Sequence, residues 1–156
     1  MKMASCKLDG LTGHQAGRKL LAELYRAETG EDLPEIRITH RGKPYFPDSD
    51  WHFSISHTPK HAFCVLSRHN VGLDAEELDR KVNLKLAEKI LSPGEKRQFD
   101  AAEKKEKALL TFWVLKEAAA KLSGEGLRGY PNHTDFALDD PRVTETDGCL
   151  VAVMEE

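Results

Sequence analysis

Apolar residues recur at helical spacing through residues 106–123, which predicts a long helix. One stripe runs along it without a break (Ala108, Phe112, Leu115, Ala119 and Leu122). A second row on another side begins with Leu110 and Trp113 and ends with Glu117 and Lys121. A helix that is apolar on two sides is expected at the centre of a fold, so Glu117 and Lys121 should face a partly enclosed space. The alternative is an exposed ion pair one helical turn apart.

Capping signals and alternation predict the other elements. Thr12-Gly13-His14-Gln15 has the pattern of a capping box and begins a helix that ends at Gly30. Ser92-Pro93-Gly94-Glu95 predicts another helix start, after a short helix over residues 84–91. Residues 1–11 could form a short strand or a loose end. Alternating apolar positions predict strands at residues 36–38, 51–56, 62–67 and 71–76, with closing strands at 136–138 and 149–153.

The strand predicted at residues 71–76 is also acidic. Gly72, Asp74 and Glu76 share one face of it, which places the two carboxylates about 6.5–7 Å apart at Cα. Gly72 should leave space beside them for a bulky group. Neighbouring carboxylates raise each other's pKa unless a cation lies between them, and oxygen ligands of this kind suit Mg²⁺. The alternative is a strand end that runs into solvent.

The two acidic segments together suggest one site. Three carboxylates (Asp74, Glu76 and Glu117) with the ammonium of Lys121 suit phosphate-group chemistry, because a metal ion and a lysine can neutralise phosphate oxygens. Basic residues elsewhere could contact an anion (Arg18, Lys43 and His57). The sequence has neither a P-loop nor a Gly-x-Gly-x-x-Gly loop, which argues against those nucleotide-binding classes.

Composition limits the broad class. Hydrophobic residues make up 40% and charged residues 31% of 156 residues, which is typical of one globular domain or two small lobes that share a core. The net charge of −3 argues against bulk nucleic-acid binding. No apolar run approaches the about 20 residues of a membrane span, and the N-terminus lacks a secretory pattern. The three cysteines form no Cys-x-x-Cys pair, so we expect reduced thiols in a cytoplasmic protein and no zinc site.

Four motifs occur in an order that is specific to one family. They are Gly42-Lys43-Pro44, Phe53-Ser54-Ile55-Ser56-His57, the Gly-x-Asp-x-Glu of residues 72–76, and Phe112-Trp113-x-x-Lys116-Glu117-Ala118-x-x-Lys121. The chain resembles the 4′-phosphopantetheinyl transferases of the Sfp type over residues 13–127. The Trp and Lys-Glu-Ala elements resemble the subgroup linked to fatty-acid and polyketide-like synthases. Compared with that pattern the chain is expected to be shortened at both ends, and to be a monomer or a dimer.

The resemblance implies a fold and a reaction. The fold is α+β, with two similar α/β halves (residues 1–69 and 70–156) related by a pseudo-twofold axis and a ligand cleft between them. The reaction is transfer of the phosphopantetheine group from coenzyme A to a serine of an apo acyl or peptidyl carrier protein, with release of adenosine 3′,5′-bisphosphate. The alternative function is a non-catalytic module that binds coenzyme A or the carrier protein.

The resemblance also implies roles for individual residues. The metal ligands for Mg²⁺ would be Asp74, Glu76 and Glu117. Glu117, or a water that it orients, would accept the proton of the carrier serine, and Lys121 would stabilise the departing phosphate. The remaining coenzyme A contacts are divided between the 3′-phosphate (Arg18, Ser56 and His57) and the adenine end (Gly42, Lys43 and Pro44).

Overall fold

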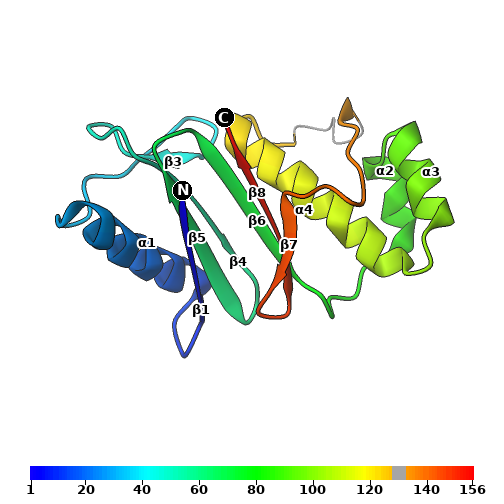
Figure 1. The fold of residues 1–156 in the computed structure, drawn as a ribbon, viewed down its shortest axis with the longest axis horizontal. Helices are drawn as coiled ribbons and strands as arrows, with labels where there is room; N and C mark the ends of the chain where they lie inside the picture. The colour runs from blue at the N-terminus through cyan, green and yellow to red at the C-terminus, as the bar shows by residue number, and fades with distance from the viewer. Residues whose placement is uncertain (128–132) are drawn as a thin grey trace.

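Two three-stranded antiparallel sheets form the centre of the molecule in the computed structural model, which describes residues 1–127 and 133–156 (Figure 1). The first sheet has the order β1-β5-β4 (Lys2–Lys7, His61–Ser67 and His52–His57). The second has the order β6-β8-β7 (Val71–Glu77, Cys149–Glu155 and Val143–Thr146). A two-stranded ribbon pairs β2 with β3 (Arg37–Ile38 and Pro44–Tyr45). These elements form an α+β fold, in which α-helices are combined with antiparallel sheets.

Each sheet has one long helix packed against it. Helix α1 (Gly13–Thr29) lies against the first sheet, and α4 (Lys105–Ser123) lies against the second (Figure 1). Three short helices gather beside the N-terminal part of α4, namely η1, α2 and α3 (Leu84–Leu86, Ala87–Ile90 and Pro93–Ala101). None of the described helices is both long and apolar enough to cross a membrane. The pseudo-twofold axis and the division at residues 69 and 70 remain predictions.

The two sheets meet where β4 lies beside β6. No backbone ladder joins these two described strands; the Ser54 hydroxyl instead accepts a hydrogen bond from the backbone N–H of Leu73 at 3.0 Å, and the Ser56 hydroxyl accepts one from Ala75 at 3.2 Å. Because buried backbone N–H groups need partners, these serines satisfy the edge of β6 that faces β4. The junction therefore places Ser56 next to the acidic strand.

Local capping signals predicted the helix boundaries well. Both capping boxes are present: Thr12 caps α1, which ends at Gly30 in the left-handed conformation, and Ser92 caps α3 with Pro93 at its start. The helix predicted at residues 106–123 is α4, and the hairpin predicted from the alternation at 51–67 is β4–β5. The sequence left residues 1–11 as either a short strand or a loose end, and the structure shows that they contain the strand β1.

The strand predicted at residues 136–138 is wrong. Side chains of α3 bind this segment in place of a neighbouring strand: Glu95 Oε2 accepts from the Phe136 N–H at 2.8 Å, and Gln98 bonds both the Phe136 carbonyl and the Leu138 N–H at 3.0 Å. The partner of β8 is β7, joined to it by the turn at Asp147 and Gly148. The backbone of residues 136–138 therefore bonds to polar side chains of α3. The alternation of apolar and polar residues in the sequence cannot show such partners.

The space expected beside Gly72 is filled by the backbone of α4. A Cβ atom at Gly72 would lie 2.2 Å from the Ala118 carbonyl oxygen and 2.4 Å from the Leu122 nitrogen. Gly72 therefore leaves no room for a ligand. Its lack of a side chain allows α4 to pack directly on β6, which brings the two acidic segments together.

Candidate active site

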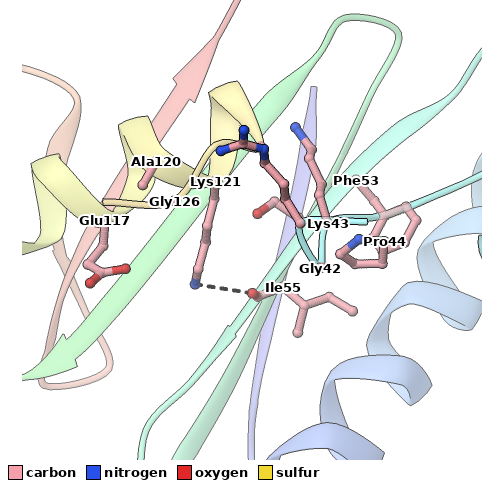
Figure 2. Close-up of a pocket in the computed structure, with 12 residues that line it drawn as sticks. Gly42, Lys43, Pro44, Phe53, Ile55, Glu117, Ala120, Lys121 and Gly126 are labelled. Atoms are coloured by element: carbon pink, nitrogen blue, oxygen red, sulfur yellow. Dashed lines mark hydrogen bonds between the residues drawn. The ribbon is translucent and has the colours of Figure 1, made fainter. Parts of the chain in front are cut away.

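Helix α4 presents Glu117 and Lys121 from one side of its C-terminal half (Figure 2). Neighbouring positions on the helix are held in the core, where Val114, Leu115 and Ala118 are fully buried against β8. This packing fixes the rotation of the helix. Glu117 and Lys121 are consequently half-buried rather than on an open surface, and the exposed ion pair considered from the sequence does not form.

Asp74 is the centre of the polar contacts. Its Oδ1 atom accepts hydrogen bonds from the Lys121 ammonium and the Ser56 hydroxyl, each at 3.1 Å. The Lys121 ammonium also donates to the carbonyl oxygen of Ile55 at 3.4 Å (Figure 2). The Oδ2 atom of Asp74 is buried and has no hydrogen-bond partner among the described residues. Burial raises the pKa of Asp74, while the Lys121 ammonium opposes that shift.

The other two carboxylates are coupled to Asp74 through their charges. Burial, followed by repulsion from Asp74, raises the pKa of Glu117, and Glu76 adds to the same effect. Glu76 forms an ion pair with Arg80 at 2.5 Å. The three carboxylates are close enough to perturb one another, but their oxygens are not gathered into one cluster. Among the described residues, three potential metal ligands whose atoms all lie within 4.8 Å of one another are found at a different place, namely His61, Glu77 and Cys149.

The Asp74 side of this arrangement fits a divalent cation, and Glu76 and Glu117 would have to move closer to share it. The Oδ2 atom of Asp74 is a buried acceptor, and such atoms are costly unless a hydrogen-bond donor or a cation reaches them. Mutual repulsion among the carboxylates would be relieved by the same ion. Because the predicted donors are all carboxylate oxygens, the residues suit Mg²⁺ better than a softer metal.

A pocket of about 230 Å³ opens beside these groups. Its walls come from the loop before β3, from β4, and from the C-terminal part of α4 with the turn that follows (Figure 2). The lining residues are Arg41, Gly42, Lys43, Pro44, Phe53, Ser54, Ile55, Glu117, Ala120, Lys121, Gly124 and Gly126. Three of the four predicted motifs therefore contribute side chains or backbone to one cavity, and Asp74, from the remaining motif, is bonded to Lys121 at its edge.

Lys43 lies in this wall with its ammonium turned toward the end of α4. It donates to the Leu122 carbonyl at 2.8 Å and to the Asn70 side chain at 2.7 Å. Burial lowers the pKa of Lys43. Its neighbour Arg41 also lines the pocket and forms an ion pair with Glu125 at 2.8 Å. Two basic side chains thus connect the loop to the end of α4 and to the turn that follows it.

The three residues predicted to contact the 3′-phosphate all lie outside the pocket lining. His57 is exposed and packs on the start of α1, where a Cβ atom at Gly13 would lie 2.2 Å from the imidazole ring. Arg18 is half-buried on α1. Ser56 is buried and reaches the site through Asp74 instead of the cavity. The assignment of these three residues to a 3′-phosphate remains a prediction.

Lys116 is buried in the core and paired with a carboxylate, which its motif did not indicate. Its ammonium forms an ion pair with Glu95 Oε1 at 2.7 Å, with both side chains fully buried, and also donates to the Thr134 hydroxyl at 2.6 Å. Glu95 in turn accepts the Ser92 and Phe136 N–H groups. Lys116 therefore joins α4 to α3 and to the segment around Phe136, on a different side of the helix from Glu117.

Comparison with known proteins identifies the family. The model of the 4′-phosphopantetheinyl transferase superfamily matches residues 70–148, which is just over half of the chain and includes Asp74, Glu76, Glu117 and Lys121. The chain belongs to the 4′-phosphopantetheinyl transferase superfamily. The resemblance drawn from the four motifs is therefore confirmed.

Individual relatives give the same result. The 4′-phosphopantetheinyl transferase gsp of Aneurinibacillus migulanus is 34% identical over 119 residues, covering 75% of this chain and 48% of its own length. HetI of Nostoc sp. is 29% identical over 122 residues (72% and 52%), and psf-1 of Bacillus pumilus is 28% identical over 138 residues (86% and 58%). The chain spans about half the length of the curated relatives it matches.

Proposed function

We propose that this chain transfers the 4′-phosphopantetheine group of coenzyme A to a serine of an apo acyl or peptidyl carrier protein. The observation that carries the proposal is the position of Asp74. It is a buried carboxylate with one oxygen held by Lys121 and Ser56 and the other without a described partner, beside a pocket and two further carboxylates. Phosphoryl transfer depends on positioning and on charge stabilisation, and this arrangement can supply both.

In this proposal Asp74, Glu76 and Glu117 hold Mg²⁺. When bound, the ion would neutralise pyrophosphate oxygens of coenzyme A. Glu117 accepts the proton of the carrier serine, directly or through a water, and its raised pKa suits that task because a general base works best when its pKa lies closer to the operating pH. Lys121 stabilises charge on the departing phosphate from its position at the edge of the pocket.

The same proposal divides the binding of coenzyme A. Gly42, Lys43 and Pro44, which line the pocket, are assigned to the adenine end by resemblance. Arg18, Ser56 and His57 are assigned to the 3′-phosphate by resemblance alone. The two halves, residues 1–69 and 70–156, would form the two sides of the ligand cleft. The protein is placed in the cytoplasm, where coenzyme A and apo carrier proteins occur together.

The test is a direct transfer assay. The protein, coenzyme A and Mg²⁺ are incubated with an apo acyl carrier protein, and the carrier is weighed by mass spectrometry. We expect the mass of one phosphopantetheine group to be gained, the gain to be lost in Asp74→Asn and Lys121→Met, and to be retained in Asp100→Asn. Asp100 is a matched control, since its carboxylate is exposed and forms an ion pair with Lys96 on α3.

Two outcomes would contradict the proposal. If no carrier gains mass, the protein does not act as a transferase on the carriers tested and the proposal fails. If coenzyme A binds but no carrier gains mass, the non-catalytic binding module is favoured instead. A wild-type rate in Asp74→Asn would show that the reaction takes place without the arrangement described here.

A further inference from the structure

A second polar cluster lies at the far end of β6, on the other face of the strand from Asp74 and Glu76. It contains His61, the first residue of β5, Glu77, the last residue of β6, and Cys149, the first residue of β8. Glu77 and Cys149 are direct partners in the β6–β8 register, so their side chains emerge on the same face. That face also carries the apolar core shared with β5. The candidate active site uses none of these three side chains.

The distances in this cluster are close to those of a metal site. One ligand atom from each side chain lies within 4.8 Å of the other two. The Cys149 sulfur is 3.7 Å from Nδ1 of His61, and Glu77 Oε1 is 2.8 Å from the same nitrogen. Sulfur and nitrogen bound to one tetrahedral zinc ion, at their usual bond lengths, are separated by about 3.6 Å. The carboxylate would need to move only about 0.6 Å from the imidazole to reach a tetrahedral separation.

The donor types also select the metal. A thiolate, an imidazole and a carboxylate match zinc, and three protein ligands leave a fourth position for a water or another ligand. Thr58 donates its hydroxyl hydrogen to Glu77 Oε1 at 2.6 Å, which orients the carboxylate as the hydrogen-bond partners of metal ligands commonly do. The side chains of His61 and Glu77 are 12% and 10% exposed, so the cluster is sheltered but reachable.

The surrounding charge favours a cation. Burial raises the pKa of Cys149 to about 12, and the carboxylates of Glu77, Asp147 and Asp79 act in the same direction. Burial by itself disfavours any ion, so the attraction for Zn²⁺ comes from the three carboxylates alone. On binding, the thiol proton is released to solvent and the sulfur bonds the metal, with no change of oxidation state.

We propose that His61, Glu77 and Cys149 form a zinc site that clamps the two sheets together. His61 belongs to the β1-β5-β4 sheet, while Glu77 and Cys149 belong to the β6-β8-β7 sheet. One ion would therefore link both sheets at the end of the core. The cysteine spacing gave no sign of it, because only one of the three ligands is a cysteine and the other two come from separate strands. The proposal is independent of the proposed transferase activity.

The same three side chains could instead form a metal-free network. Glu77 already accepts hydrogen bonds from Thr58 and His61, and this satisfies the carboxylate without an ion. The two possibilities differ in what the sulfur does. Only a metal site turns the buried Cys149 thiol into a bound thiolate, so a spectroscopic signal from that sulfur separates them.

The test uses Co²⁺ as a probe for Zn²⁺ on the full, reduced chain, with excess Mg²⁺ present to occupy oxygen sites. We expect one equivalent of Co²⁺ to bind with a sulfur-to-cobalt charge-transfer absorption, and Zn²⁺ to displace it and raise the melting temperature. Cys149→Ser should remove the absorption, and Glu77→Gln should weaken binding by at least about tenfold. Cys6→Ser is the matched control and should change neither, because Cys6 lies on β1 outside the cluster.

The wild-type protein alone can overturn the proposal, so a variant that fails to fold does not leave it open. Absence of the charge-transfer absorption in folded wild-type protein would mean that the cluster is the metal-free network. An absorption that persists in Cys149→Ser would assign the sulfur to another cysteine and would exclude this site. Transfer activity plays no part in either result.

Discussion

Replacing Gly72 with alanine should separate α4 from β6. The added Cβ atom would lie 2.2 Å from the Ala118 carbonyl oxygen, 2.4 Å from the Leu122 nitrogen and 2.9 Å from the Leu122 Cα atom. All three are backbone atoms of a helix, so no side-chain rotation can relieve the contact. A carbon and a carbonyl oxygen approach to about 3.4 Å at closest, which means that the helix must move by about 1 Å.

That movement should affect stability and chemistry together. Forcing a methyl group into a packed core costs typically about 1–3 kcal/mol, and contact with rigid backbone places this substitution at the upper end. A displacement of about 1 Å would also lengthen the 3.1 Å contact between Lys121 and Asp74 beyond hydrogen-bonding distance. Misplacement of this size can reduce a rate by about 100-fold.

The assay is urea unfolding alongside the carrier mass assay. Gly10→Ala is the control: no described atom lies within 4 Å of the position that its Cβ atom would take, but the φ of Gly10 is 85°, so it reports the cost of a methyl group in a strained backbone without a clash. We expect Gly10→Ala to lose about 1–2 kcal/mol and to keep its transfer rate. A Gly72→Ala protein with wild-type stability and rate would refute the claim that close packing of α4 on β6 builds the site.

Two further outcomes follow from the charges. Because the folded-state pKa of Glu117 is raised, its carboxylate destabilises the metal-free fold fully above that pKa. The penalty shrinks as the pH falls below the folded-state pKa and is gone below the unfolded-state pKa. Glu117→Gln should therefore unfold at a higher urea concentration than wild type at neutral pH without Mg²⁺, and a less stable variant would contradict this expectation. Calorimetry on the wild type should show that its affinity for Mg²⁺ falls as the pH falls. Lys116→Met should lower the free energy of unfolding in urea by about 3–5 kcal/mol, since it leaves the fully buried Glu95 without its cation. Adding Glu95→Gln should recover part of that loss, and additive losses in the double variant would argue against a coupled pair.

The sequence predicted those features that depend on near neighbours. The capping boxes at Thr12 and Ser92 involve residues three positions apart, and both helices begin where those residues predict. The two faces of β6 were also correct, because alternation along a strand is a local property. Val71, Leu73 and Ala75 are in the core, while Gly72 faces α4.

Features that depend on distant partners were missed or misread. Gly72 looked like open space because the sequence does not show that α4 crosses it. Lys116 looked like one element of a polar motif, whereas its partner Glu95 lies on another helix. The segment at residues 136–138 looked like a strand because its backbone partners are the side chains of Glu95 and Gln98. In each case a contact between separate elements decided the outcome.

The motif Lys116-Glu117-x-x-x-Lys121 accordingly combines two different functions on one helix. Successive residues on a helix point about 100° apart, so Lys116 reaches the core around Glu95 while Glu117 and Lys121 reach β6 and the pocket. The buried pair fixes the position of α4 relative to α3, and Gly72 fixes it relative to β6. The carboxylates stay close enough to repel one another because these two contacts prevent the helix from moving away.

Strand β6 has a comparable division between its two faces. Asp74 and Glu76 face α4 and the candidate active site, whereas Glu77 ends the core face and meets His61 and Cys149. A zinc clamp at Glu77 would hold the sheets together without touching the packing of α4, and the clash at Gly72 would displace α4 without touching the clamp. Loss of Cys149 should therefore lower stability while sparing transfer by the folded protein, and Gly72→Ala should lower both. If the two variants gave the same profile, the faces of β6 would not be independent, and the zinc site could not be treated as separate from the catalytic one.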